Sequence, residues 1–232
     1  WFAREGESTE NVYSHVQPNW FGPVAEECRA AREAAILLDQ SSFGKHLVQG
    51  RDAVPFLQHL CAGNIDVPVG KLVYTHMLNR RGGIETDITV NRLAENRFLI
   101  ISSATIYPRD KAWIERHITG EENVTLTDVT SGYAVLSLQG PKSREILSQL
   151  TDADLGNDAF PFATSQEIDV GYARVIVNRL TYIGELGWEL HIPTEFSQGV
   201  CDAALGAGIG AGSMAPARAP AAGVAVAAGE AA

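Results

Sequence analysis

The sequence has 232 residues, 45% of them hydrophobic, which is enough to bury a core in one large domain or two small ones. Its formal net charge of −10 and pI near 5.0 argue against a nucleic-acid partner, because phosphate binding needs clustered Lys and Arg. No apolar run reaches the roughly 20 residues of a membrane helix, so we expect no membrane partner. Cys28, Cys61 and Cys201 are widely spaced and odd in number, which indicates buried thiols in a reducing compartment. The six histidines show no metal-ligand spacing, and we expect no metal.

The first half of the chain predicts helices and strands in alternation. A helix is predicted over residues 22–38, where apolar residues recur on one face: Val24, Cys28, Ala31, Ala35 and Leu38. A short strand and turn follow over residues 41–50. A second helix is predicted within residues 51–64, with Asp52 as a possible cap. Residues 71–104 read as three strands, separated by turns at 82–83 and 94–96.

The second half continues this mixture, which indicates an α+β fold with antiparallel sheets and flanking helices. Residues 108–118 predict a short helix, and residues 133–150 change from strand to helix at Gly140 and Pro141. Residues 172–193 predict two strands around a glycine-rich turn, and a last helix starts near residue 194. After residue 205 the chain is mostly Ala and Gly, which predicts a low-complexity tail that buries little apolar surface.

Asp87 occupies an unusual position in the second of the three strands. Ile88 and Val90 alternate with Asp87 and Thr89, which is the period of a β-strand, yet Asp is depleted in strands. One interpretation is a half-solvated strand that turns its polar residues to water. The other is a carboxylate held there for chemistry. The pattern by itself leaves both open.

Four stretches in this order resemble the aminomethyltransferase family, the glycine-cleavage T-protein group that binds tetrahydrofolate. They are LLDQSSFGKHLVQGRDA, YTHMLNRRGGIETDITV, LSLQGPKSREIL and RLTYIGELGWEL. The opening WFAREG, together with NWFGPVAEECRAAREAAILLDQSSF, is similar to the junction in dimethylglycine and sarcosine dehydrogenases, where a FAD-dependent oxidase half precedes a T-protein-like half. The resemblance implies a T-protein-like folate-binding fold in a piece of a longer flavoenzyme. Tetrahydrofolate would bind this chain, and FAD only the missing upstream half in the same full-length polypeptide.

The resemblance also implies site residues. Asp87 matches the family's functional carboxylate in the G-G-[IV]-x-x-D motif, and its strand would then face the folate cavity. A carboxylate suits transfer of a one-carbon unit from an N-methyl amine, because it stabilises a developing cation and accepts the proton released at ring closure. Glu185 matches a glutamate that the family uses for the pterin ring. Weaker candidates for the folate site are the following residues: Tyr74, Met77, Leu78, Tyr182, Trp188 and Arg179. Tyr74, Met77 and Leu78 are at least as typical of a core, and aromatic residues in strand patterns such as Tyr182 and Trp188 are more often core. Arg179 fits either an ion-pair partner of a site carboxylate or a solvated strand residue.

The expected domain organisation has three parts: a junction segment at 1–20, an incomplete folate-binding domain at 21–205, and a tail at 206–232. The family continues with an Arg-bearing segment and a C-terminal barrel, and here the tail stands in their place, a switch that a shift of the reading frame would produce. The leading hypothesis is methylene transfer to tetrahydrofolate within a dimethylglycine- or sarcosine-dehydrogenase-like enzyme. The alternatives are a non-catalytic folate-binding module, a stand-alone aminomethyltransferase of glycine cleavage, and an inactive remnant. The expected compartment is the bacterial cytoplasm, or the mitochondrial matrix in a eukaryote.

Overall fold

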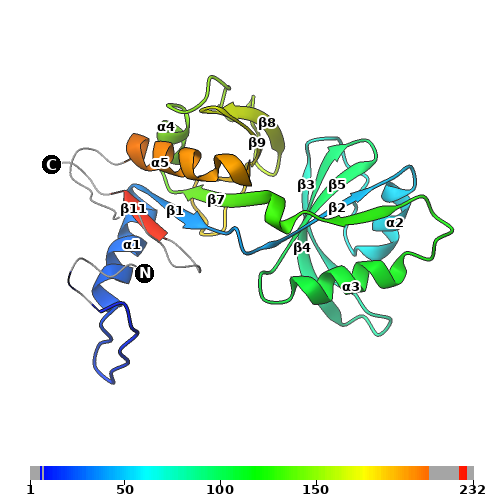
Figure 1. Cartoon of the computed structure of the whole chain (residues 1–232), viewed down its shortest axis with the longest axis horizontal. Helices are drawn as coiled ribbons and strands as arrows, with labels where there is room; N and C mark the ends of the chain where they lie inside the picture. Colours follow the sequence, from blue (N-terminus) through cyan, green and yellow to red (C-terminus); the bar gives the residue numbers. More distant parts are fainter. Residues whose placement is uncertain (1–5, 7, 209–224, 229–232) are drawn as a thin grey trace.

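The structure is a computed structural model, and it describes residue 6, residues 8–208 and residues 225–228. Two lobes, each built on one antiparallel sheet, lie side by side (Figure 1). Sheet A has the strand order β11-β1-β7-β10-β9-β8. Its strands are β1 (Ala35–Asp39), β7 (Tyr133–Gln139), β8 (Ser165–Val170), β9 (Ala173–Asn178), β10 (Gly187–Pro193) and β11 (Ala225–Ala228).

Sheet B forms the other lobe, in the strand order β3-β4-β5-β2-β6. Its strands are β2 (Gly44–Gln49), β3 (Leu72–Leu78), β4 (Ile84–Ala94), β5 (Arg97–Ser102) and β6 (Thr125–Asp128). The helices are α1 (Phe21–Glu33), α2 (Ala53–Leu60), α3 (Tyr107–His117), α4 (Ser143–Leu147) and α5 (Ser197–Gly208), with 3-10 turns at Thr130–Gly132 and Thr194–Phe196.

Each sheet has its own hydrophobic core on one face. In sheet A, Trp188, Leu190 and Ile192 of β10 pack with residues of α4 and α5. In sheet B, Ile88 and Val90 of β4 pack with residues of α2 and α3. Because strand side chains alternate, the opposite face of each sheet carries its polar residues. These two polar faces meet where the lobes join.

Two sequence predictions on local structure need correction. The helix predicted over residues 22–38 ends at Glu33, and Ala35–Asp39 is instead strand β1, paired with β7. The apolar run there fits a buried strand as well as a helix, and tertiary pairing decides between them. Asp52 is not a side-chain cap of α2, because its Oδ2 accepts the backbone N–H of Asn123 at 2.7 Å. Strands β6, β8 and β11 were not predicted, and the expectation of buried thiols is wrong for Cys28, which is exposed.

Most of the predicted low-complexity tail, residues 209–224 and 229–232, lies outside the residues that the structure describes. Residues 206–208 complete α5, and β11 pairs with the β1 edge of sheet A.

Candidate functional site

The candidate site lies on the polar face of sheet B. Along β4, Thr86, Ile88 and Val90 are buried on the side of the helices. Asp87 and Thr89 point to the other side, where Asp87 is exposed and Thr89 is half-buried. The Asp87 carboxylate is therefore open to a ligand on this face.

Strand β3 holds the Asp87 side chain in place. The Tyr74 hydroxyl donates a hydrogen bond to Asp87 Oδ2 at 2.9 Å. This bond raises the pKa of Tyr74, so the phenol remains a donor at neutral pH. His76 stands directly opposite Asp87 in the ladder, and its ring meets the Tyr74 ring edge-on with centroids 5.7 Å apart. Asp87, Tyr74 and His76 are hereafter called the Asp87 group.

The same face of β4 continues into the junction between the lobes. Asn91 is fully buried, and its Nδ2 donates to Ser165 Oγ at 2.8 Å and to Asn178 Oδ1 at 3.0 Å. Asn178 Nδ2 lies 3.0 Å from His191 Nε2. Because these groups are buried and bonded to one another, they fix β4 of sheet B relative to β9 and β10 of sheet A.

A second carboxylate reaches this junction from β10. Glu189 is paired with Asn178 on β9 and with Ser137 on β7, and its side chain is only 15% exposed. Burial raises the pKa of Glu189 to about 7. Burial, assisted by the charge of Lys45, lowers the pKa of His191 to about 3, so this imidazole is neutral and offers no cation to Glu189, 3.9 Å away. Glu189 is therefore a buried acid that can gain or lose a proton near neutral pH.

Glu185 has a different environment from Glu189, although both come from the same motif. Arg32 of α1 forms an ion pair with Glu185, with 2.7 Å between Arg32 Nη1 and Glu185 Oε1. The same guanidinium donates to the Ile183 carbonyl oxygen at 3.0 Å. The ion pair thus ties the turn before β10 to α1. Tyr182, in this turn, is 75% exposed.

The remaining predicted residues do not join the Asp87 group. Met77 is fully buried in the core of sheet B, on the face opposite Asp87, and Trp188 is fully buried in the core of sheet A. Leu78 lies at the end of β3 and is 41% exposed. Arg179 is buried, donates to the Phe160 carbonyl oxygen and to Asn157 Oδ1, and lies over the Trp188 ring. Its partners are a carbonyl, an amide and an indole.

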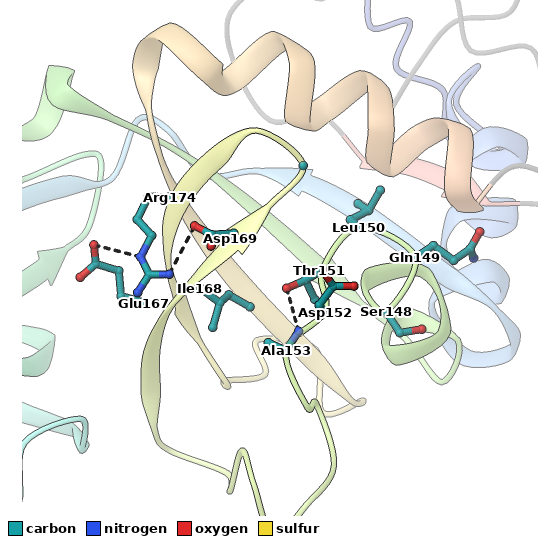
Figure 2. Close-up of a pocket in the computed structure, with 11 residues that line it drawn as sticks. Ser148, Gln149, Leu150, Thr151, Asp152, Ala153, Glu167, Ile168, Asp169 and Arg174 are labelled. Carbon is teal, nitrogen blue, oxygen red and sulfur yellow. Dashed lines mark hydrogen bonds and ion pairs between the residues drawn. The ribbon is translucent and has the colours of Figure 1, made fainter.

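A surface hollow of about 460 Å³ lies on the sheet A lobe (Figure 2). It is lined by the loop at 148–153 and by Glu167, Ile168, Asp169, Gly171 and Arg174. Arg174 pairs there with both Glu167 and Asp169, at 3.6 and 3.3 Å. The hollow shares no residue with the Asp87 group and is a separate surface feature.

Metal ligands do not gather in the described part of the chain, where no three His, Cys, Asp or Glu side chains are placed to bind an ion together. Of the helices within residues 8–208, none is long and apolar enough to cross a membrane.

The fold and these motifs can be compared with known proteins. Residues 1–219 match the family model of the GCVT N-terminal domain. The chain belongs to this family. The resemblance to aminomethyltransferases is thereby confirmed, as is the expected α+β T-protein-like fold.

Relatives with curated names are much longer than this chain. A 4-methylaminobutanoate oxidase (formaldehyde-forming) of Paenarthrobacter nicotinovorans is 37% identical over 210 residues, which cover 90% of this chain and 25% of the oxidase. Human mitochondrial dimethylglycine dehydrogenase is 34% identical over 209 residues, or 90% of this chain and 24% of that protein. The crystal structure of glycine cleavage system aminomethyltransferase T from Bartonella henselae matches with a TM-score of 0.71 and 26% identity, covering 85% of this chain and 53% of that one. The GCVT domain described here thus spans about a quarter of the length of the two named enzymes.

Two features of the GCVT domain escaped the sequence analysis. Glu189 lies four residues after Glu185, but the motif does not reveal that its side chain is only 15% exposed. Asn91 continues the alternation of Asp87 and Thr89, and this period-2 pattern of polar residues was the available signal.

Proposed function

We propose that this GCVT domain transfers a one-carbon unit to tetrahydrofolate, as part of a dimethylglycine- or sarcosine-dehydrogenase-like flavoenzyme. The observation that carries the proposal is the exposed Asp87 carboxylate, held by the Tyr74 hydroxyl on the polar face of sheet B. Family membership and the names of the relatives support the same chemistry.

The reaction explains why a carboxylate is suited to this position. Oxidation of an N-methyl amine and hydrolysis yield formaldehyde, and N5 of tetrahydrofolate attacks its carbon. Water leaves, N10 closes the ring, and a proton is released, so tetrahydrofolate and formaldehyde give methylene-tetrahydrofolate and water. Asp87 stabilises the cationic intermediate and accepts the N10 proton. Tyr74 orients the carboxylate with its hydrogen bond.

Pterin recognition needs an acceptor for the paired N–H donors of the ring edge. Glu185 remains the candidate from the family motif, but its carboxylate is engaged by Arg32. Glu189 offers a second candidate, because its side chain is only 15% exposed and its one ion-pair contact among the described residues is with His191, which is neutral. Comparing Glu185→Gln with Glu189→Gln for tetrahydrofolate affinity distinguishes the two. Substitution of the residue that binds the pterin should weaken tetrahydrofolate binding by about 10-fold or more, as expected for the loss of a charge-assisted hydrogen bond.

The flavin chemistry is proposed to reside in another domain of the same full-length polypeptide, since the named oxidase and dehydrogenase relatives are about four times as long as the matched region. In a eukaryotic host the proposed compartment is the mitochondrial matrix, and the name of the human relative states that that protein is mitochondrial. In a bacterial host it would be the cytoplasm.

The test combines binding with turnover in the full-length protein. Titration calorimetry should show saturable tetrahydrofolate binding, and addition of an N-methyl amine should convert bound folate to methylene-tetrahydrofolate. Folate binding without transfer would favour the alternative of a non-catalytic folate-binding module. Absence of folate binding would contradict the proposal.

A further inference from the structure

A β-bulge lies directly before Asp87. The register of the β3–β4 ladder shifts between Met77 and Leu78, which leaves Glu85 as an extra residue on β4. A bulge bends its strand and changes the direction of the side chains that follow. The direction of Asp87 therefore depends on what fixes residues 85 and 86.

The first turn of α3 contacts both of these residues. Arg109 forms an ion pair with Glu85, whose carboxylate also accepts a hydrogen bond from Asn79 Nδ2 at 2.9 Å. The next residue of α3, Asp110, accepts a hydrogen bond from the Thr86 hydroxyl, with 3.1 Å between Thr86 Oγ1 and Asp110 Oδ2. Two consecutive helix residues thus hold two consecutive strand residues.

The contact between Asp110 and Thr86 is the stronger of the two constraints. Asp110 is 2% exposed and Thr86 is 3% exposed, whereas the Arg109 side chain is 55% exposed. A buried polar group is costly to leave unpaired, while an exposed ion pair contributes little. Burial raises the pKa of Asp110, and the Thr86 hydrogen bond opposes this shift. The shorter of the two hydrogen bonds of the Thr86 hydroxyl is thus a buried one to Asp110, at 3.1 Å against 3.3 Å to the Asp87 carbonyl oxygen.

We propose that Asp110 is a positioning residue that fixes the direction of Asp87 through Thr86, an inference that rests on the proposed function. Thr86 and Asp110 lie on the core side of β4, and the Thr86 hydroxyl lies 3.3 Å from the Asp87 carbonyl oxygen, so Thr86 acts on the exposed face through the backbone of Asp87. A displacement of about 1 Å in a reacting group can cost about 100-fold in rate. Loss of the contact should therefore lower kcat for methylene transfer and leave the KM for tetrahydrofolate nearly unchanged.

The experiment measures kcat and KM for methylene transfer in the full-length protein with two matched pairs of variants. Thr86→Val removes the hydroxyl and keeps the shape, whereas Thr86→Ser keeps the hydroxyl. Asp110→Ala removes the acceptor, whereas Asp110→Asn keeps an amide oxygen that can accept from Thr86. We expect kcat to fall about 10- to 100-fold in the Val and Ala variants and to stay within about threefold of wild type in the Ser and Asn variants.

Glu115→Gln is the control on the same helix, because it removes the exposed Lys111–Glu115 ion pair of 2.6 Å without touching β4. It should leave kcat unchanged. Rates are normalised to the concentration of folded, folate-binding sites, so a purely structural role would lower that concentration and not kcat. If Asp110→Ala does not fold, the comparison of kcat between Thr86→Val and Thr86→Ser tests the positioning role.

The outcomes separate the two proposals. An active wild type with equal kcat in Thr86→Val and Thr86→Ser would overturn the positioning role alone. A wild type that neither binds tetrahydrofolate nor transfers the one-carbon unit would overturn the proposed function and this inference with it.

Discussion

The buried carboxylate of Glu189 should make the stability of the protein depend on pH. Burial raises its pKa from the ordinary value of 4.5 to about 7, and each pKa unit corresponds to about 1.4 kcal/mol. Below about pH 4.5 the group is protonated in both the folded and the unfolded state, and it then costs nothing. Between about pH 4.5 and pH 7 the unfolded state releases the proton first, so the free energy of unfolding falls as pH rises. Above pH 7 the loss levels off at about 3 kcal/mol.

Glu189→Gln should therefore stabilise the protein by up to about 3 kcal/mol near pH 8 and have little effect near pH 4. Urea denaturation of both proteins across this pH range gives the difference in unfolding free energy directly. Glu167→Gln is the control, since Glu167 is a carboxylate of the same sheet whose side chain is 62% exposed. A Glu189→Gln effect of the same size at both pH values would refute the argument from burial.

Other substitutions test separate parts of the structure. Gly140→Ala should lower the free energy of unfolding by about 1–3 kcal/mol in urea denaturation, because φ of Gly140 is +123° and the new Cβ would lie 2.6 Å from the Ala34 carbonyl oxygen. An unchanged urea concentration at the unfolding midpoint would contradict this prediction. Trp188→Ala removes a fully buried ring from the core of sheet A and should cost about 3–5 kcal/mol in the same measurement. Tyr74→Phe should slow methylene transfer by about 10-fold, because a hydrogen bond to a carboxylate is worth about 1.5 kcal/mol or more. The temperature of thermal unfolding should stay near that of wild type, because the Tyr74 side chain is exposed. Methylene transfer at the wild-type rate would show that the hydrogen bond to Asp87 is not used.

The sequence predicted those parts of the fold that depend on local patterns. The three strands β3, β4 and β5 follow from period-2 alternation and from turns at residues 82–83 and 94–96. Ala35–Asp39 was placed in a helix because a short apolar run has no clear period, and only its pairing with β7 makes it a strand. Strand β8 was missed, although its alternation is visible once its partner β9 is known.

In the candidate site, too, the sequence predicted the local contacts and missed those made by tertiary packing. Asp87 and Tyr74 come from one hairpin, so a local motif brings them together. Glu189 and Asn91 are distant in sequence, and they come to one junction, around Asn178, only when the two lobes pack against each other. The contact of Asp110 with Thr86 likewise joins a helix to a strand 24 residues away. Such contacts are set by tertiary packing, which composition and periodicity do not encode.

The central claim is that Asp87 is the base of one-carbon transfer to tetrahydrofolate. The most direct measurement compares wild type and Asp87→Asn in the full-length protein, recording amine oxidation and methylene-tetrahydrofolate formation in the same reaction. Asparagine keeps the size and the hydrogen-bonding oxygen but cannot accept the proton. We expect methylene-tetrahydrofolate formation to slow by about 100- to 10,000-fold, with amine oxidation at the wild-type rate and formaldehyde released instead. Methylene-tetrahydrofolate formation at the wild-type rate in Asp87→Asn would contradict the account.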